Sequence, residues 1–201
     1  GSVLDASPIN VASDKRHPVI ACATNQRCRL AFIDNMIDQA QSLSINTASI
    51  GGSAILEHPT PGQSGNHGVT GIAIGVSSGT PTNYLVAFQD SNGVVWADAV
   101  DSSGGKLYSS AQSLHDPGGL SFFGGLEVAH EGFRFLVTWD GTDGGNVPAT
   151  LGATIDAAMN HSDARVLYIT GSNFTKTAIV RGADIGSTGA YLAASRVEES
   201  S

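Results

Sequence analysis

A short apolar pattern recurs along the chain at intervals of roughly fifty residues. Each copy begins at an aromatic-like position, continues with leucine or small apolar residues, and reaches a second aromatic position. The four copies begin at Cys28, Tyr84, Phe135 and Tyr191. A period of this length is typical of folds in which similar units of secondary structure pack against one another. The repeat therefore constrains the fold more than any single motif does.

Each copy is one of several short apolar runs in its unit. Another run precedes it, as in residues 72–74, and a third ends in a short polar residue, as at Asp101 and Asp156. A fourth run follows. The turns between them are rich in Gly, Asn, Asp and Ser, and no segment has helical periodicity. The sequence therefore predicts units of four short strands.

The last unit lacks its third and fourth runs. Counterparts occur near the N-terminus, in residues 3–5 and 8–12. A unit divided between the termini closes a ring and leaves no exposed sheet edge. We therefore expect an all-β fold, a four-bladed β-propeller whose last blade is closed by N- and C-terminal strands, with a β-sandwich as the alternative. It is expected to be a single domain spanning residues 2–201, with Gly1, alone or with Ser2, interpreted as a tag remnant.

The pattern resembles the repeats of extracellular bacterial β-propellers, which carry a (Tyr/Phe)-Leu-Val-x-(Trp/Phe)-x-Asp strand and a Val-Asp-x-x-Gly turn. The best-matching stretches run from Tyr84 to Gly104 and from Phe135 to Asp156. The first and last units depart from it, with Cys28 in place of the aromatic residue and Ser195 in place of the tryptophan. The resemblance implies a propeller outside the cell.

The two cysteines, Cys22 and Cys28, flank a short polar segment between two apolar runs. Two strands joined by this turn would place the sulfur atoms opposite each other, so we expect a disulfide that fixes the hairpin register. Two free thiols are the alternative, and a zinc site lacks a second pair of ligands. A disulfide favours an extracellular, cell-surface or periplasmic location.

The net charge and the motifs of the sequence disfavour several classes of function. The chain has 10 basic and 18 acidic residues and a net charge of -8, which disfavours nucleic acid because phosphate binding requires a basic surface. No apolar run is long enough to span a bilayer. Nucleophile-elbow, phosphate-loop and zinc-protease motifs do not occur, and the six histidines are scattered singly, as in solvated loops. We therefore predict that the protein is not an enzyme.

Four residues are predicted to bind a ligand. Glu127 lies within the innermost strand of its unit and Arg181 just past that of the adjacent unit. They would contact a ligand in a central tunnel, and a structural ion pair between them is the alternative. Phe122 and Phe123 lie between glycine pairs, and two adjacent aromatic residues in an extended chain cannot both face one core. One of them is expected to contact a sugar, a peptide or a second subunit, unless the loop folds over the end of the blades.

Several side chains in the sequence carry oxygen atoms that could coordinate a metal ion. Asp140, Asp143 and Asn146 lie in a glycine-rich loop that would suit calcium, but the loop lacks the closing Glu of the helix-loop-helix calcium motif. Turn hydrogen bonds explain the same residues. Asp101 and Asp156 likewise are interpreted as local turn residues, together with Asp5 and Asn46. We therefore expect no metal and no cofactor.

These observations predict a lectin-like, non-enzymatic binding or adhesion module of a secreted or cell-surface protein. Its ligand, a carbohydrate or a protein, would be recognised by rim loops on a rigid scaffold. Two alternatives stay open. One is a structural or assembly domain that self-associates, and the other is a hydrolase or lyase acting on glycans, which would need a second carboxylate beside Glu127.

Overall fold

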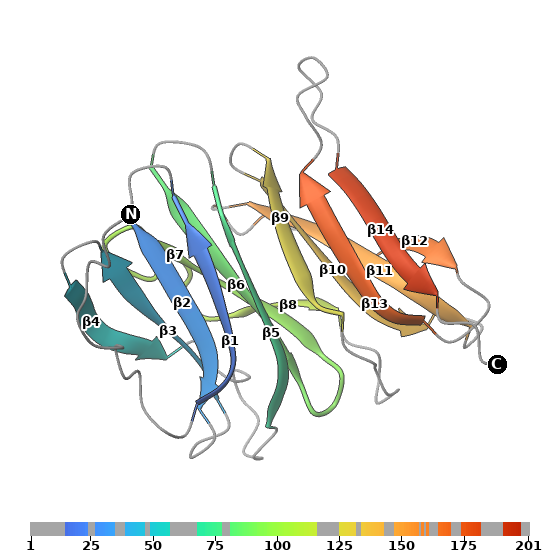
Figure 1. Ribbon diagram of the computed structural model, residues 1–201, viewed down its shortest axis with the longest axis horizontal. Coiled ribbons are helices and arrows are strands. Elements are labelled where there is room, and N and C mark those ends of the chain that lie inside the picture. Colours follow the sequence, from blue (N-terminus) through green and yellow to red (C-terminus); the bar gives the residue numbers. More distant parts are fainter. Residues whose placement is uncertain are drawn as a thin grey trace, which may run out of the picture.

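The computed structural model describes residues 15–23, 27–34, 39–46, 49–56, 68–77, 81–115, 125–131, 134–142, 147–156, 158, 160, 165–169, 174–181 and 191–197. All of their regular structure is β-strand. Consecutive strands pair antiparallel, so each sheet is a meander (Figure 1). Within the described ranges, no helix is long and apolar enough to cross a membrane.

The strands form three four-stranded sheets and a hairpin. Sheet I contains β1 (Lys15–Cys22), β2 (Cys28–Asp34), β3 (Gln39–Asn46) and β4 (Ser49–Leu56). Sheet II contains β5 (Val69–Val76), β6 (Asn83–Asp90), β7 (Val95–Asp101) and β8 (Gln112–His115). Sheet III contains β9 (Glu127–Glu131), β10 (Arg134–Thr142), β11 (Pro148–Asp156) and β12 (Arg165–Ile169). The hairpin pairs β13 (Phe174–Arg181) with β14 (Tyr191–Val197).

These sheets confirm the predicted all-β fold and the four-stranded organisation of the first three units. The fourth unit contributes the hairpin β13–β14. The segments predicted to complete it, residues 3–5 and 8–12, lie outside the described residues.

The strand registers show that the sequence repeat is also a structural repeat. Tyr84 is opposite Val100 in sheet II, and Phe135 is opposite Ile155 in sheet III. In sheet I the equivalent position holds Cys28, opposite Ile45. The first residue of each of the first three copies of the pattern therefore occupies the same place in its sheet.

Bulky residues on one face of β6 and of β10, the second strands of their sheets, pack onto the preceding sheet. Successive side chains of a strand point to opposite faces. Phe88 of β6 is buried in a cluster with Ala31 and Ile33 of sheet I, whereas Trp139 of β10 is buried in a cluster with Ala97 of sheet II. Burial of one such side chain stabilises the fold by about 1.5–3 kcal/mol. Sheet II thus lies between two sheets, and β6 is buried along its whole length.

The aromatic residues at the strand positions of the repeat are expected from the sequence to pack between units, and they are buried wherever their side chains are described. Tyr84, Phe88, Phe135 and Trp139 are all buried. The side chain of Tyr191, the fifth, lies outside the described residues.

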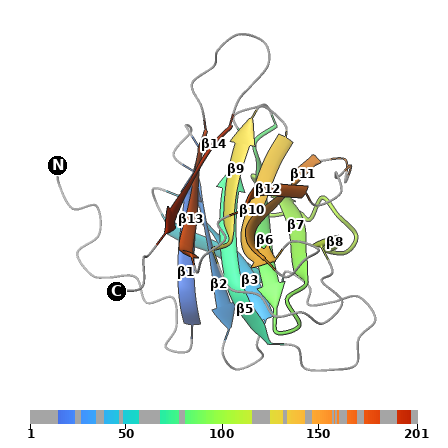
Figure 2. The same cartoon turned by 90° about the vertical axis from the view of Figure 1, so that its right-hand side faces the viewer.

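The first strands of successive units form a row. Strand β5 contacts both β1 and β9, and β9 contacts β13. Figure 1 shows this row along the front of the molecule, and in Figure 2 strands β7, β8 and β11 lie on the side away from β1 and β13. The row is tightly packed at Gly75 of β5, where a Cβ atom would lie 2.5 Å from Cγ1 of Val128 in β9.

Cys22 and Cys28 form the predicted disulfide across the β1–β2 ladder. The alternative of two free thiols is therefore wrong. The turn that the disulfide closes also contacts sheet II, because the main-chain carbonyl of Arg27 accepts a hydrogen bond from the Tyr84 hydroxyl at 2.8 Å.

Candidate functional site

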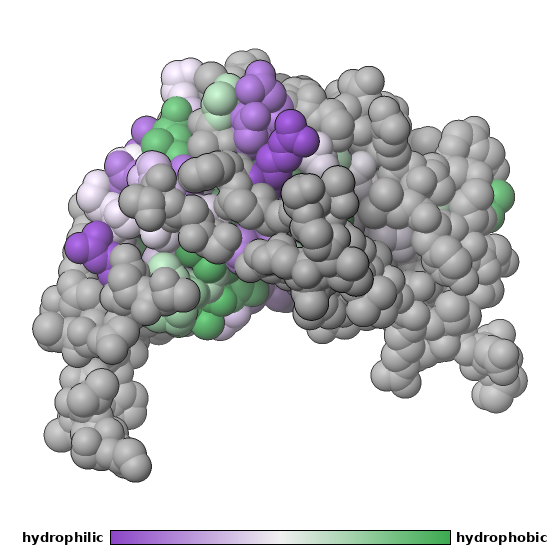
Figure 3. Space-filling model, turned by 90° about the horizontal axis from the view of Figure 1, so that it is seen from above, coloured by the Kyte–Doolittle hydropathy of each residue, from purple (hydrophilic) through white to green (hydrophobic). Residues whose placement is uncertain are grey.

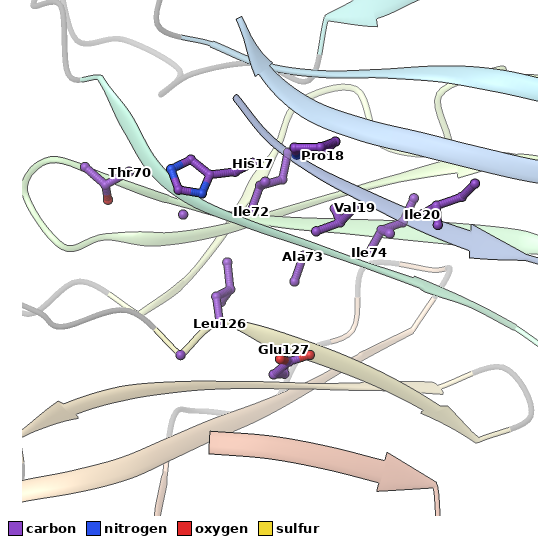
Figure 4. Close-up of a pocket in the computed structure, with 12 residues that line it drawn as sticks. His17, Pro18, Val19, Ile20, Thr70, Ile72, Ala73, Ile74, Leu126 and Glu127 are labelled. Carbon is purple, nitrogen blue, oxygen red and sulfur yellow. The ribbon is translucent and has the colours of Figure 1, made fainter. Parts of the chain in front are cut away.

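A groove of about 610 Å³ lies where β1, β5 and β9 come together (Figure 4). Binding sites for small ligands commonly have volumes of roughly 300–1,000 Å³. The groove is open to solvent along β1, the least buried strand of sheet I for which side chains are described. Its lining residues are His17, Pro18, Val19, Ile20, Thr70, Gly71, Ile72, Ala73, Ile74, Gly125, Leu126 and Glu127.

Most of the lining side chains are aliphatic. Ile72 and Leu126 are buried, whereas Ile20 is 56% exposed. Among the described residues, the exposed large hydrophobic side chains are those of Ile20 and, at 36%, Leu107, and Leu107 does not line the groove. In the view from above, the described surface shows an apolar area beside hydrophilic side chains (Figure 3). No Phe, Tyr or Trp occurs among the described lining residues.

Ionisable side chains enter the groove from two walls. Glu127, the first residue of β9, provides a half-buried carboxylate, and the exposed imidazole of His17 comes from β1. Figure 4 shows these two residues with β5 running between their strands. The groove therefore combines an apolar surface with one carboxylate and one imidazole.

The backbone at His17 has an uncommon conformation. Its φ is 51°, in the left-handed region, and the β1–β2 register shifts between Arg16 and Val19. A β-bulge of this kind bends a strand and re-aims its side chains. Just before it, the Arg16 guanidinium donates a hydrogen bond to the Val69 carbonyl at 3.0 Å, which ties β1 to β5. The strained residue is therefore held at the mouth of the groove.

The groove is bordered by sheet edges. Strands β1, β5 and β9 each stand at one end of the strand order of their sheets. On its outer side, an edge strand carries N–H and C=O groups that its own ladder does not use. Backbone hydrogen-bonding groups thus accompany the aliphatic side chains.

Of the four predicted binding residues, the structure places Glu127 in the groove. Arg181 is the last residue of β13 and pairs with Tyr191, but its side chain lies outside the described residues. The predicted contact between Glu127 and Arg181 therefore stays a prediction. Phe122 and Phe123 lie outside the described residues altogether.

The expectation that the histidines lie in solvated loops is wrong for three of them. His17 lies in β1, His115 in β8 and His130 in β9. The ring of His115 packs against that of Trp139, with 5.6 Å between the centroids. For His17 the one available signal was the following Pro18, since a proline inside a strand often marks an edge or a bulge.

The loop predicted to begin at Asp140 begins later. Strand β10 continues to Thr142, and Asp140 is a buried strand residue opposite Thr150. Its carboxylate lies against the backbone of Gly125, whose φ is +68°. The other two calcium candidates, Asp143 and Asn146, lie outside the described residues. Within the described ranges, no group of three His, Cys, Asp or Glu residues could hold a metal ion.

The recurring aspartates make local turn hydrogen bonds, as predicted. The Asp101 carboxylate accepts hydrogen bonds from the N–H groups of Ser103 and Gly105, both at 2.8 Å. The Asp156 carboxylate accepts equivalent bonds from Ala158 and Asn160 at 2.8 and 3.0 Å. Burial raises the pKa of both carboxyl groups, but the hydrogen bonds outweigh it and hold each pKa below its usual value. The side chains of Asp5 and Asn46 lie outside the described residues.

The sequence matches no protein-family model, and no curated protein is significantly similar to it. The resemblance to bacterial propeller repeats therefore stays a prediction from motifs.

Proposed function

We propose that the protein is a four-bladed β-propeller that serves as a non-enzymatic binding or adhesion module, with the groove between β1, β5 and β9 as its ligand site. The propeller is supported by three meander sheets with equivalent registers and by the row of their first strands. Sheet II is covered by a different sheet on each face, whereas a β-sandwich has two layers. Residues 3–5 and 8–12 would complete the fourth blade beside β14.

The observation that carries the binding function is the groove itself. In a propeller, the first strands of the blades surround the central channel, and this groove lies between three of them. Glu127 is the one carboxylate among the described lining residues, whereas glycoside hydrolysis uses two carboxyl groups that flank the scissile bond. The arrangement suits recognition better than turnover.

An extracellular or periplasmic setting is part of the proposal. The Cys22–Cys28 disulfide supports it, because such bonds persist mainly in oxidising compartments. The net charge of -8 makes nucleic acid an improbable ligand.

A thermal-shift screen with oligosaccharides, peptides and fatty acids tests the proposed function. A ligand present at 100 times its Kd stabilises the folded state by about 2.7 kcal/mol. For a ligand class that raises the Tm of the wild type, we expect the rise in Tm to be lost in Ile20→Ser and retained in Leu107→Ser, because Leu107 is exposed outside the groove. A ligand that stabilises the wild type and both variants equally would show that the groove is not its site.

A further inference from the structure

We propose that the groove binds a short, extended, apolar peptide segment with a basic residue directed toward Glu127. This inference rests on the proposed binding function and adds the chemical class of the ligand.

The lining favours an apolar ligand over a sugar. Val19, Ile20, Ile72, Ile74 and Leu126 provide an aliphatic surface, and the polar side chains among the described lining residues are those of His17, Thr70 and Glu127. A sugar ring that entered the groove would lose the hydrogen bonds between several of its hydroxyl groups and water. Few side chains in the groove could replace those bonds, and an unpaired buried hydroxyl is costly. Aliphatic side chains of a peptide would instead gain from burial.

The strand edges favour an extended backbone. A peptide that adds to a sheet edge obtains affinity from main-chain hydrogen bonds and specificity from alternate side chains. Strand β5 lines the groove over residues 70–74 and is one of the two edge strands of sheet II. At about 3.3 Å per residue, this stretch matches a peptide of roughly five residues. Such a peptide would direct alternate side chains toward the aliphatic surface.

The charge of the site favours a basic residue in the ligand. Glu127 is the one carboxylate among the described lining residues, and the chain as a whole carries a net charge of -8. Glu127 also interacts within the protein, but a carboxylate has about four acceptor positions and accepts from more than one donor. A lysine ammonium or an arginine guanidinium would add a charge-assisted hydrogen bond in a partly buried site.

The test measures the affinity of the full chain for labelled pentapeptide pools by fluorescence anisotropy. Each pool contains Val, Ile, Leu and Thr at random, with one position fixed as Lys, Gln or Glu. We expect the Lys pools to bind at least tenfold more tightly than the Glu pools. We also expect backbone N-methylation of the best peptide to weaken its binding at least tenfold, because it removes main-chain donors. The proposal would be overturned if all pools bound equally tightly, or if the N-methylated peptide bound as tightly as its unmethylated form.

Variants place the interaction in the groove. Glu127→Gln should abolish the preference for Lys, and Glu127→Lys should reverse it, whereas Leu107→Ser should bind like the wild type. Ile20→Ser should weaken binding of every pool. Because Ile20 is 56% exposed, this variant is expected to keep the wild-type Tm and circular dichroism spectrum. Peptide binding that survives both Glu127 variants with its Lys preference intact would overturn the role of Glu127.

Failure of the ligand class can be distinguished from failure of the binding function. If no peptide pool binds, but an oligosaccharide or a fatty acid raises the Tm of the wild type and not of Ile20→Ser, the groove is a binding site and the peptide inference is wrong. If peptides bind Ile20→Ser as they bind the wild type, the protein binds peptides outside the groove, and both the peptide inference and the placement of the ligand site in the groove are wrong.

Discussion

The Tyr108 hydroxyl, from the segment that joins β7 to β8, donates a hydrogen bond to the main-chain carbonyl of Asp156 in sheet III. On the other side of sheet II, the Tyr84 hydroxyl donates to the carbonyl of Arg27, in the turn of sheet I. Both tyrosines are 1% exposed. On each side of sheet II, a buried tyrosine hydroxyl thus donates a hydrogen bond to a main-chain carbonyl of the neighbouring sheet. This bond adds to the apolar packing between the two sheets.

Removing the Tyr108 hydroxyl should weaken the junction between sheets II and III. In Tyr108→Phe the packing of the ring is retained, but the Asp156 carbonyl loses its partner. We expect the free energy of unfolding in urea to fall by about 0.5–1.5 kcal/mol, the net contribution of a typical hydrogen bond, because this bond is only partly buried. Burial raises the pKa of Tyr108, with further increases from the Asp156 and Asp98 carboxylates. A stability equal to that of the wild type would show that water replaces the hydroxyl.

A methyl group at Gly75 should separate β5 from β9. Its Cβ would lie 2.5 Å from Cγ1 of Val128, and overpacking of this kind costs about 1–3 kcal/mol. Gly71→Ala is the matched control on the same strand, because the nearest atom to its Cβ would be 3.9 Å away. We expect Gly75→Ala to lower Tm and Gly71→Ala to leave it unchanged or raise it. The double variant Gly75→Ala/Val128→Ala should recover part of the loss, and no recovery would argue against this contact as the cause.

The sequence predicts the repeat well because its determinants are local. The recurring aromatic positions indicate that Phe88 and Trp139 pack between units, and the recurrence of Asp101 and Asp156 indicates their turns. The groove was not predictable as such, since it depends on how far apart β1, β5 and β9 pack. The bulge at His17 follows from a register shift between two strands, which no pattern within one strand specifies. Asp140 was assigned to a loop because turn residues follow it, although β10 continues for two more residues.

Acid should destabilise the turns after β7 and β11. The pKa values of Asp101 and Asp156 are lowered in the folded state, so their contribution to stability is present above the ordinary carboxyl pKa of 3.8 and is lost as the pH falls through their folded values. We expect the wild type to lose more stability than Asp101→Asn when unfolding is compared at pH 5 and pH 3. The variant should also be less stable than the wild type at pH 7. Parallel pH curves for the two proteins would contradict the assignment.

Removing the disulfide should affect the groove more than the whole fold. The bond closes only a short loop, so the chain-entropy estimate of its stabilisation is about 2 kcal/mol. It fixes one end of β1, whose other end is interrupted by the bulge, and β1 provides Val19 and Ile20 to the groove. In Cys22→Ser/Cys28→Ser we expect faster amide exchange in residues 19–22, with exchange in β6 changed no more than the fall in global stability requires. The same variant should also bind the tightest-binding Lys pentapeptide more weakly than the wild type does. If β1 and β6 instead exchange at the same rate in the variant, β1 opens only with the whole protein, and the disulfide does not specifically support this wall of the groove.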